Sequence, residues 1–391
     1  MTAPVRRVHS DPQRSRGVAV LGSTGSIGRT ALRVIERQRD RFHVAAITAF
    51  TDAVGLAGQE EQWHPAFVGL VNPSGSALPP GWRSGSEALV EAVLRPDVDI
   101  VLNAVVGATG LDATLRALGA GKRVALANKE TLVMAGELVS AAALRGGGEI
   151  IPVDSEHSAI LQCIGGRPRA EVRRLVLTAS GGPFRTWTPE AMRDASLADV
   201  MRHPTWSMGR KITVDSATLA NKALEVIEAH FLFGIPYDRI EVVVHPQSVV
   251  HSMVEFVDGS VMAQLGVPSM ELPVLYALTH PERVEDAGVP RFDPVAASPL
   301  TFEPVRPDAF PTFRLGLEAA AAGGAAPAVY NAANEAAVAL FLDAQMPYSE
   351  IPTLVQAALT AYGHLPARDR ESLLHADREA RALVRAAGKP R

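Results

Sequence analysis

Cysteine is almost absent from the chain: Cys163 is the only one in 391 residues. A single cysteine excludes an internal disulfide and a cysteine-rich zinc site. Its neighbours in "AILQCIGG" are apolar, which predicts a buried, unreactive thiol rather than a nucleophile. This cysteine usage is typical of the reducing cytoplasm, so we predict a cytoplasmic protein.

Long apolar runs and a strong net charge are also missing. No stretch reaches the roughly 18 uninterrupted apolar residues of a membrane span. The net charge is −4, from 38 basic and 42 acidic residues. We therefore expect neither a membrane nor a nucleic acid as partner. Residues 1–16 are basic but lack the apolar segment of a secretory signal, and we expect a disordered leader.

The chain is too long for one hydrophobic core, and its pattern changes along its length. Strands and helices alternate from residue 17 to about 150, which predicts an α/β fold with a parallel, helix-covered sheet. We assign residues 1–154 to this domain, which is Rossmann-like in its order of elements. Residues 155–285 are strand-rich around one long helix at 216–233, which predicts an α+β domain.

The last third of the chain has two further regions. Six prolines between residues 290 and 311 predict an extended linker over 286–311, because proline lacks the backbone donor of regular structure. Residues 312–391 are alanine-rich and helical in pattern, and Gly323 and Gly324 separate the first two helices. We predict a C-terminal helical bundle.

A glycine-rich segment opens the first domain. "VAVLGSTGSIGRT" places Gly22, Gly25 and Gly28 between a predicted strand and a predicted helix. Glycines at such a turn let backbone N–H groups approach a pyrophosphate at the helix N-terminus. The spacing is G-x-x-G-x-x-G rather than G-x-G-x-x-G, and a strand–turn–helix without a phosphate is the alternative.

The end of the next strand bears on the cofactor. It reads "AITAFTD", with no acidic residue before Asp52. An acid at this place binds the ribose 2′-hydroxyl of NAD and would repel the 2′-phosphate of NADP. Its absence favours NADP weakly, although no lysine or arginine takes its place.

Acidic side chains in two segments indicate a metal site. Asp154 and Glu156 follow the strand-like "EIIPV", and two carboxylates at i and i+2 of an extended segment point the same way. Like charges held together need a cation between them. Glu225, which shares a predicted helix face with Asn221 and Lys222, supplies a possible third ligand. Three carboxylates suit Mg²⁺ or Mn²⁺; an exposed turn and a surface ion pair are the alternatives.

Other polar residues suit an anion. Ser216 lies at the predicted start of the long helix, and Ser180 lies in the turn "LTASGGPFR" at a strand end. Together with Asn221 and Lys222 they suit a phosphate group. The segment "TWSMGRK" predicts a mobile lid with apolar contacts.

Seven segments carry a resemblance to a known family: "GSTGSIG", "ANKETLVMAG", "PVDSEHSAI", "TASGGPFR", "HPTWSMGRKITVDSATLANKALEVIEAHFLF", "HPQSVVHSMVEFVDGS" and "NAANEAAVALFL". From residue 17 to about 345 the chain resembles the 1-deoxy-D-xylulose 5-phosphate reductoisomerase family. The resemblance implies a homodimer that uses NADPH and Mg²⁺ or Mn²⁺. It implies rearrangement and reduction of a phosphorylated ketose, 1-deoxy-D-xylulose 5-phosphate, to 2-C-methyl-D-erythritol 4-phosphate, in non-mevalonate isoprenoid biosynthesis.

The resemblance also implies residue roles. It implies NADPH contacts for Thr24, Gly25, Ser26, Ile27, Asn128, Glu130 and Gly209. It implies metal binding by Asp154, Glu156 and Glu225. It implies substrate binding by Ser155, Glu156, Ser180, His203, Ser216, Asn221, Lys222 and Glu225. It implies catalytic roles for Lys129, Glu156, His203 and Glu225, with residues 203–208 closing as the lid.

Two departures and two rival functions qualify this reading. Many members have a polar stretch such as Gly-Lys-Asn where this chain has Ala49 to Thr51, which weakens the expectation of strict NADPH preference. Thr205 stands where asparagine is frequent. A semialdehyde dehydrogenase is one rival, but it needs a cysteine nucleophile, and Cys163 has no base beside it in sequence. A non-catalytic nucleotide-binding protein is the other, and it has no use for three metal carboxylates.

Overall fold

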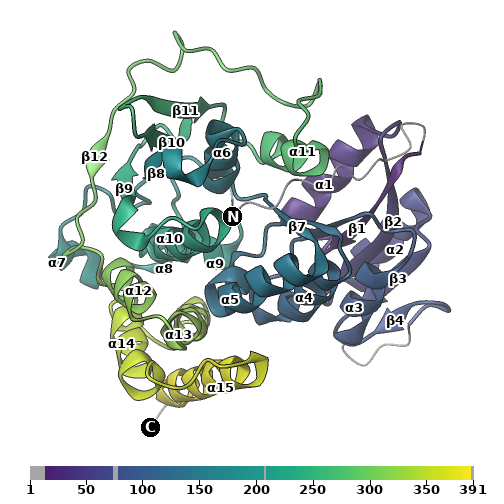
Figure 1. Cartoon of the computed structure of the whole chain (residues 1–391). Helices are drawn as coiled ribbons and strands as arrows, with labels where there is room; N and C mark the ends of the chain where they lie inside the picture. Colours follow the sequence, from purple (N-terminus) through teal and green to yellow (C-terminus); the bar gives the residue numbers. More distant parts are fainter. Residues whose placement is uncertain (1–13, 74–77, 207, 389–391) are drawn as a thin grey trace.

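The computed structural model describes residues 14–73, 78–206 and 208–388. Two sheets lie side by side, and the C-terminal helices pack below them (Figure 1). The first sheet is parallel throughout, in the order β4-β3-β2-β1-β5-β6-β7. Its strands are β1 (Arg16–Leu21), β2 (Phe42–Ala49), β3 (Phe67–Leu70), β4 (Arg83–Ser84), β5 (Ile100–Asn103), β6 (Arg123–Leu126) and β7 (Glu149–Pro152).

Helices cover both faces of this sheet because its strands are apolar on both sides. Val18 and Val20 pack in one core, whereas Ala19 and Leu21 pack in another. The helices of the first face are α1 (Ser26–Arg37), α2 (Ala53–Trp63) and α11 (Glu271–Thr279). Those of the second are α3 (Glu87–Leu94), α4 (Leu111–Gly119), which follows the 3₁₀ turn η1 (Gly107–Gly110), and α5 (Lys129–Gly146). The predicted Rossmann-like architecture is confirmed.

The second sheet is mixed, in the order β11-β10-β8-β9-β12. Strands β8 and β9 are parallel, and the other pairs are antiparallel. Its strands are β8 (Val172–Ala179), β9 (Ile240–Val244), β10 (Val250–Phe256), β11 (Val261–Leu265) and β12 (Glu303–Pro304), the last within the proline-rich segment. The remaining elements of this region are α6 (Ser155–Ile164), η2 (Arg169–Glu171), α7 (Pro189–Arg193), α8 (Leu197–Val200), α9 (Arg210–Ala217), α10 (Ala220–Phe233) and η3 (Tyr237–Arg239).

Two local predictions in this region are wrong. Asp154 and Glu156 do not lie on an extended segment: Asp154 is the N-cap of α6, and Glu156 lies in its first turn. The predicted long helix at 216–233 is two helices, since Leu219 adopts a left-handed conformation (φ 56°) between α9 and α10. Ser216 therefore lies in the last turn of α9 rather than at a helix start.

Four helices end the chain, as predicted: α12 (Pro311–Ala322), α13 (Ala326–Leu342), α14 (Glu350–Tyr362) and α15 (Arg370–Ala387). They share one core with residues of α9 and α10, so the bundle is not an isolated unit. In the part of the chain that the structure covers, every helix is too short or too polar to cross a membrane. The leader was expected to extend to residue 16, but Arg16 already pairs with Phe42 in the sheet. Residues 1–13 lie outside the described residues.

Candidate active site

The site lies at the carboxyl edge of the first sheet. Parallel strands all end at the same edge, so the segments that follow them meet there, and ligands of such sheets bind at this edge. The glycine turn follows β1, Lys129 follows β6, and Asp154 follows β7. Since β6 and β7 are neighbours, Lys129 and Asp154 meet, and their side chains form an ion pair.

The glycine turn has the shape that a dinucleotide pyrophosphate requires. Gly22 has φ +77°, and a Cβ there would lie 2.7 Å from the carbonyl oxygen of Ala104. A Cβ on Gly28 would lie 2.3 Å from the carbonyl oxygen of Gly22, so only glycine lets α1 pack this closely on the turn. Gly25 and Ser26 are exposed, and the first turn of α1 has no acidic residue. Thr24 and Ile27 are partly exposed beside them.

Two further predicted cofactor contacts are connected by hydrogen bonds. Asn128 is buried, and its Nδ2 donates to Oε2 of Glu130 at 3.0 Å. The other oxygen of Glu130 lies 3.3 Å from Nζ of Lys211 in the first turn of α9. Gly209 is the N-cap of that helix. Glu130 and the start of α9 therefore come together, although 80 residues separate them in sequence.

The segment after β2 carries no cation. Phe50 is 53% exposed, and the carboxylate of Asp52 accepts a hydrogen bond from the backbone N–H of Gly55 at 2.9 Å as the N-cap of α2. The segment that follows β2 thus presents an exposed phenylalanine and a carboxylate rather than a cation.

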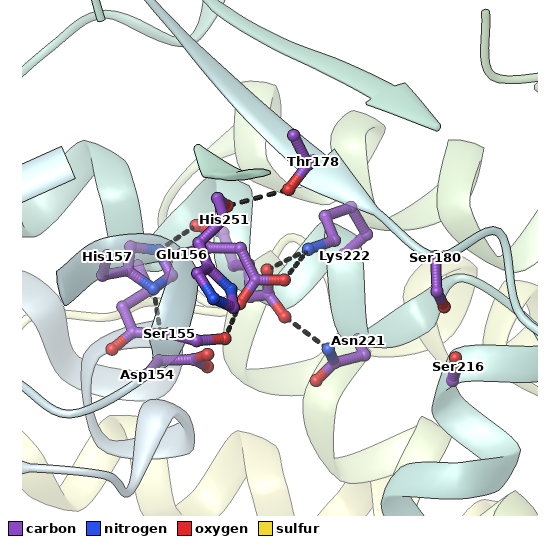
Figure 2. A network of polar contacts seen from close by, with 12 residues as sticks. Asp154, Ser155, Glu156, His157, Thr178, Ser180, Ser216, Asn221, Lys222 and His251 are labelled. Atoms are coloured by element: carbon purple, nitrogen blue, oxygen red, sulfur yellow. Dashed lines mark hydrogen bonds and ion pairs between the residues drawn. The ribbon is translucent and has the colours of Figure 1, made fainter. Parts of the chain in front are cut away.

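The three predicted metal carboxylates converge. Oxygens of Asp154, Glu156 and Glu225 all lie within 4.8 Å of one another. Asp154 and Glu156 come from the N-terminal end of α6 (Figure 2), and Glu225 comes from the second turn of α10. Glu225 is only 1% exposed, which excludes the alternative of a surface ion pair.

Two ammonium groups bind to these carboxylates. Lys129 Nζ contacts Asp154 and lies 3.2 Å from Oε1 of Glu225. Lys222 Nζ lies 2.6 Å from Oε1 of Glu156 and contacts Oε2 of Glu225. With all five groups charged, three carboxylates and two ammonium ions leave one formal negative charge. This excess of negative charge favours the binding of a further cation.

The pKa shifts follow from burial and from these charges. Burial and then the charge of Glu156 raise the pKa of Glu225 to about 7. Burial would raise the pKa of Asp154 too, but the charges of Lys129, His157 and Lys222 together outweigh burial and hold that pKa below its usual range. Burial lowers the pKa of Lys222, yet the charges of Glu156 and Glu225 raise it overall. Burial lowers the pKa of Lys129 as well, but the charges of Asp154 and Glu225 raise it overall, so Asp154 and both lysines are charged at neutral pH.

A second polar group lies beside the carboxylates. Nε2 of His203 lies 3.1 Å from Oγ of Ser180 and 3.1 Å from Oγ of Ser216. Ser180 and Ser216 face each other to one side of the carboxylate cluster in Figure 2. In this structure Asn221 and Lys222 bond to Glu225 rather than to the serines. Ser155 donates to Oε2 of Glu156 at 2.5 Å.

The predicted lid begins at His203. Its Nδ1 accepts from the backbone N–H groups of Thr205 (3.2 Å) and Trp206 (2.9 Å), so the carrier of the remaining ring proton is Nε2. The Trp206 ring lies 6.4 Å from the ring of His251, which is buried on β10. Burial lowers the pKa of His203, which keeps it neutral at neutral pH. Ser207, within the predicted lid, lies outside the described residues.

Sequence reasoning missed three ionisable residues of this region: His157, Lys211 and Glu228. His157 and Glu228 are fully buried next to Asp154, and Lys211 contacts Glu130 and Asp215. Spacing gave a signal for two of them, because His157 follows Asp154 by three residues and Glu228 follows Glu225 by three.

The fold has a parallel sheet of the dinucleotide-binding type, and a cluster of carboxylates that suits a divalent cation lies at its carboxyl edge. This combination is typical of the nicotinamide-dependent oxidoreductases. Three family models cover most of the chain. The model of 1-deoxy-D-xylulose 5-phosphate reductoisomerase matches residues 18–136, and models of its C-terminal domains match residues 150–233 and 265–383. The chain belongs to the 1-deoxy-D-xylulose 5-phosphate reductoisomerase family.

Individual relatives agree with the family models. A 1-deoxy-D-xylulose 5-phosphate reductoisomerase of Heliobacterium modesticaldum is 48% identical over 94% of this chain and 96% of its own length. The enzyme of Zymomonas mobilis in complex with NADPH has a TM-score of 0.88 at 41% identity, covering 97% of this chain and 100% of that one. A reductoisomerase structure with NADPH, fosmidomycin and magnesium has a TM-score of 0.90 at 39% identity, covering 95% and 98%.

Proposed function

We propose that this chain converts 1-deoxy-D-xylulose 5-phosphate to 2-C-methyl-D-erythritol 4-phosphate with NADPH and Mg²⁺ or Mn²⁺, as a step of isoprenoid biosynthesis. One observation carries the proposal: three carboxylates from two helices meet beside the carboxyl edge of a dinucleotide-type sheet. Family membership supports the reaction, and the solved relatives with NADPH and magnesium support the cofactors.

The residues fit a divalent cation. The donor set consists of carboxylate oxygens, which suit Mg²⁺ and Mn²⁺, and the cluster carries one formal negative charge when Glu225 is ionised. Asp154, Glu156 and Glu225 would hold the ion. When bound, a divalent cation polarises a carbonyl and a neighbouring hydroxyl of the substrate.

The two lysines are expected to change partners when the site is loaded. Lys129 and Lys222 occupy oxygens that a cation would use, so they compete with it. We propose that Lys222, once released, binds the substrate phosphate, and that Lys129 approaches the reacting carbons, where it adds positive charge or moves a proton.

The serine pair and His203 suit the phosphate. Nε2–H of His203 points at the hydroxyl oxygens of Ser180 and Ser216, because its Nδ1 already accepts from the backbone. The hydroxyl hydrogens of both serines remain able to donate to an anion. An anion there would bind three neutral donors and, with Asn221, a fourth. Since His203 opens residues 203–208, phosphate binding would order the lid, which then excludes water from the reacting carbons.

NADPH supplies the hydride, and its proposed contacts lie on three segments of the sheet edge. Thr24, Gly25, Ser26 and Ile27 lie in the glycine turn, Asn128 and Glu130 follow β6, and Gly209 starts α9.

The assay of this proposal follows the absorbance of the reduced nicotinamide with the ketose phosphate as substrate. Turnover is expected with Mg²⁺ or Mn²⁺ and is expected to stop when a chelator is added. Metal-independent turnover, or NADPH binding without any turnover, would count against the assignment. A semialdehyde dehydrogenase reaction is disfavoured by Cys163, since burial raises its thiol pKa to about 11.

We also propose a homodimer in the cytoplasm. Strand β11 is an edge of the second sheet, with Val261 55% and Met262 42% exposed, and an apolar edge strand fits pairing with a second copy. The single unpaired cysteine supports the reducing compartment. Sedimentation should give twice the chain mass, and Val261→Glu should shift it toward the monomer; a monomeric parent would refute the dimer.

A further inference from the structure

Helices α6 and α10 share a buried pair of ionisable residues next to the carboxylate cluster. His157 and Glu228 are fully buried, and Nδ1 of His157 lies 3.4 Å from Oε2 of Glu228. Both oxygens of Glu228 lack a hydrogen-bond partner among the described residues. A buried carboxylate with so few partners is a cost to folding, so stability alone does not explain its presence.

The orientation of the imidazole ring is fixed from its other side. Nε2 of His157 lies 2.9 Å from the backbone carbonyl oxygen of Glu225, and a carbonyl only accepts, so Nε2 carries the proton of this contact. The ring of Phe233 stacks on the imidazole with an interplanar angle of 13°. Nδ1 must therefore face Glu228 and Asp154.

The pair is in register with the carboxylates of the cluster. His157 follows Asp154 by one helical turn, and Glu228 follows Glu225 by one turn on the facing helix. The contact between His157 and Glu228 therefore sets how far Asp154 lies from Glu225. The contact of His157 with the Glu225 carbonyl fixes the same helical turn directly.

We propose that Glu228 and His157 are positioning residues, which fix the spacing and orientation of Asp154 and Glu225 and thereby set the affinity of the cluster for a divalent cation. This inference rests on the proposed function. Residues behind metal ligands typically contribute 10- to 100-fold to metal affinity, which is about the loss expected here.

The experiment titrates the full-length protein with Mn²⁺ and measures the free ion by electron paramagnetic resonance. Glu228→Leu should weaken Mn²⁺ binding about 10- to 100-fold. Glu228→Gln should stay within about threefold of the parent, because its amide N–H can donate to Nδ1 of a neutral His157 and keep the helices linked. Glu241→Leu, on the exposed part of β9, is the matched control and should bind Mn²⁺ like the parent.

Two further readouts separate positioning from a general structural role. NADPH affinity, measured by fluorescence, should be unchanged in all variants. The melting temperature without metal should stay level or rise in Glu228→Leu, since an apolar side chain replaces a buried carboxylate. Weaker Mn²⁺ binding without loss of stability is a result that a merely structural role does not produce.

A second variant protects the test against misfolding. His157→Phe keeps the aromatic stack on Phe233 but removes both ring nitrogens, and it should show the same loss of Mn²⁺ affinity. Parental Mn²⁺ affinity in Glu228→Leu or His157→Phe would overturn the inference. If the parent itself binds no Mn²⁺, the proposed metal-dependent function fails. The two failures can be told apart, because only the positioning role fails when the parent and the variants bind Mn²⁺ equally well.

Discussion

Glu225→Gln is the substitution whose effect the geometry predicts most directly. The amide has nearly the shape of the carboxylate, but it changes the formal charge of the cluster from one negative charge to zero. Glu225 is 1% exposed and contacts both Lys129 and Lys222, so solvent compensates little of this change.

The magnitude follows from the charge. Two unit charges 4 Å apart interact by about 4 kcal/mol at an effective dielectric constant of about 20, and a divalent cation doubles that value. The remaining amide oxygen and the lower cost of desolvating an amide offset part of it. We expect a net loss of about 4 kcal/mol, which is about 1000-fold in the Kd for Mn²⁺.

Stability should respond differently from metal binding. Burial raises the pKa of Glu225 to about 7, so in the metal-free protein this carboxyl group is already about half protonated at neutral pH. A neutral amide is therefore expected to change the melting temperature of the metal-free protein only slightly.

The assay combines Mn²⁺ binding by electron paramagnetic resonance, NADPH binding by fluorescence and turnover. Glu225→Gln should lose Mn²⁺ binding and turnover while it still binds NADPH. Glu241→Gln, at a side chain 49% exposed on β9, is the control for the same chemical change and should behave like the parent. Mn²⁺ affinity within about threefold of the parent, or retained turnover, would refute the reasoning.

Three other perturbations test separate parts of the site. Lys222→Met removes the counter-charge of Glu156 and Glu225, and breaking such a buried pair costs about 3–5 kcal/mol. The melting temperature of the metal-free protein should therefore fall by several degrees, and Mg²⁺ should restore most of the loss. A melting temperature that does not respond to Mg²⁺ contradicts this. Phe50→Arg places a cation in the segment after β2, which has none, and should raise the ratio of NADPH affinity to NADH affinity about 10- to 100-fold in fluorescence titrations. An unchanged ratio would show that the 2′-phosphate does not bind beside residue 50. Cys163 should resist alkylation at neutral pH until the protein is denatured, because burial raises its thiol pKa to about 11, and fast labelling of the folded protein would disprove the buried, unreactive thiol.

Some wrong predictions arose although the sequence contained the correct signal. Asp154, with Glu156 two residues later, is typical of a helix start, and Gly165 is typical of a helix end. The apolar strand before Asp154 led to an extended interpretation instead. The helix matters to the chemistry, because it places Asp154 at the N-cap and Glu156 in the first turn, where the helix dipole stabilises negative charge.

Other features had no local signal. Leu219 adopts a left-handed conformation and divides α9 from α10, although leucine is a good helix former. Helix α11 lies between strands β11 and β12 of the second sheet in sequence but packs on the first sheet beside α1. Both depend on which surfaces are available for burial, and that is a property of the assembled fold.

The sequence by itself determined the parallel sheet, the glycine turn, the C-terminal helices and the identity of the acidic residues, because periodicity, glycine and carboxylate chemistry are local properties. Only the tertiary structure decided that α6 and α10 face each other, that Lys129 and Lys222 bind the carboxylates, and that Glu225 and Glu228 are buried. Burial changes a carboxylate from a solvated charge into one that needs a nearby cation, and burial depends on contacts between segments about 70 residues apart.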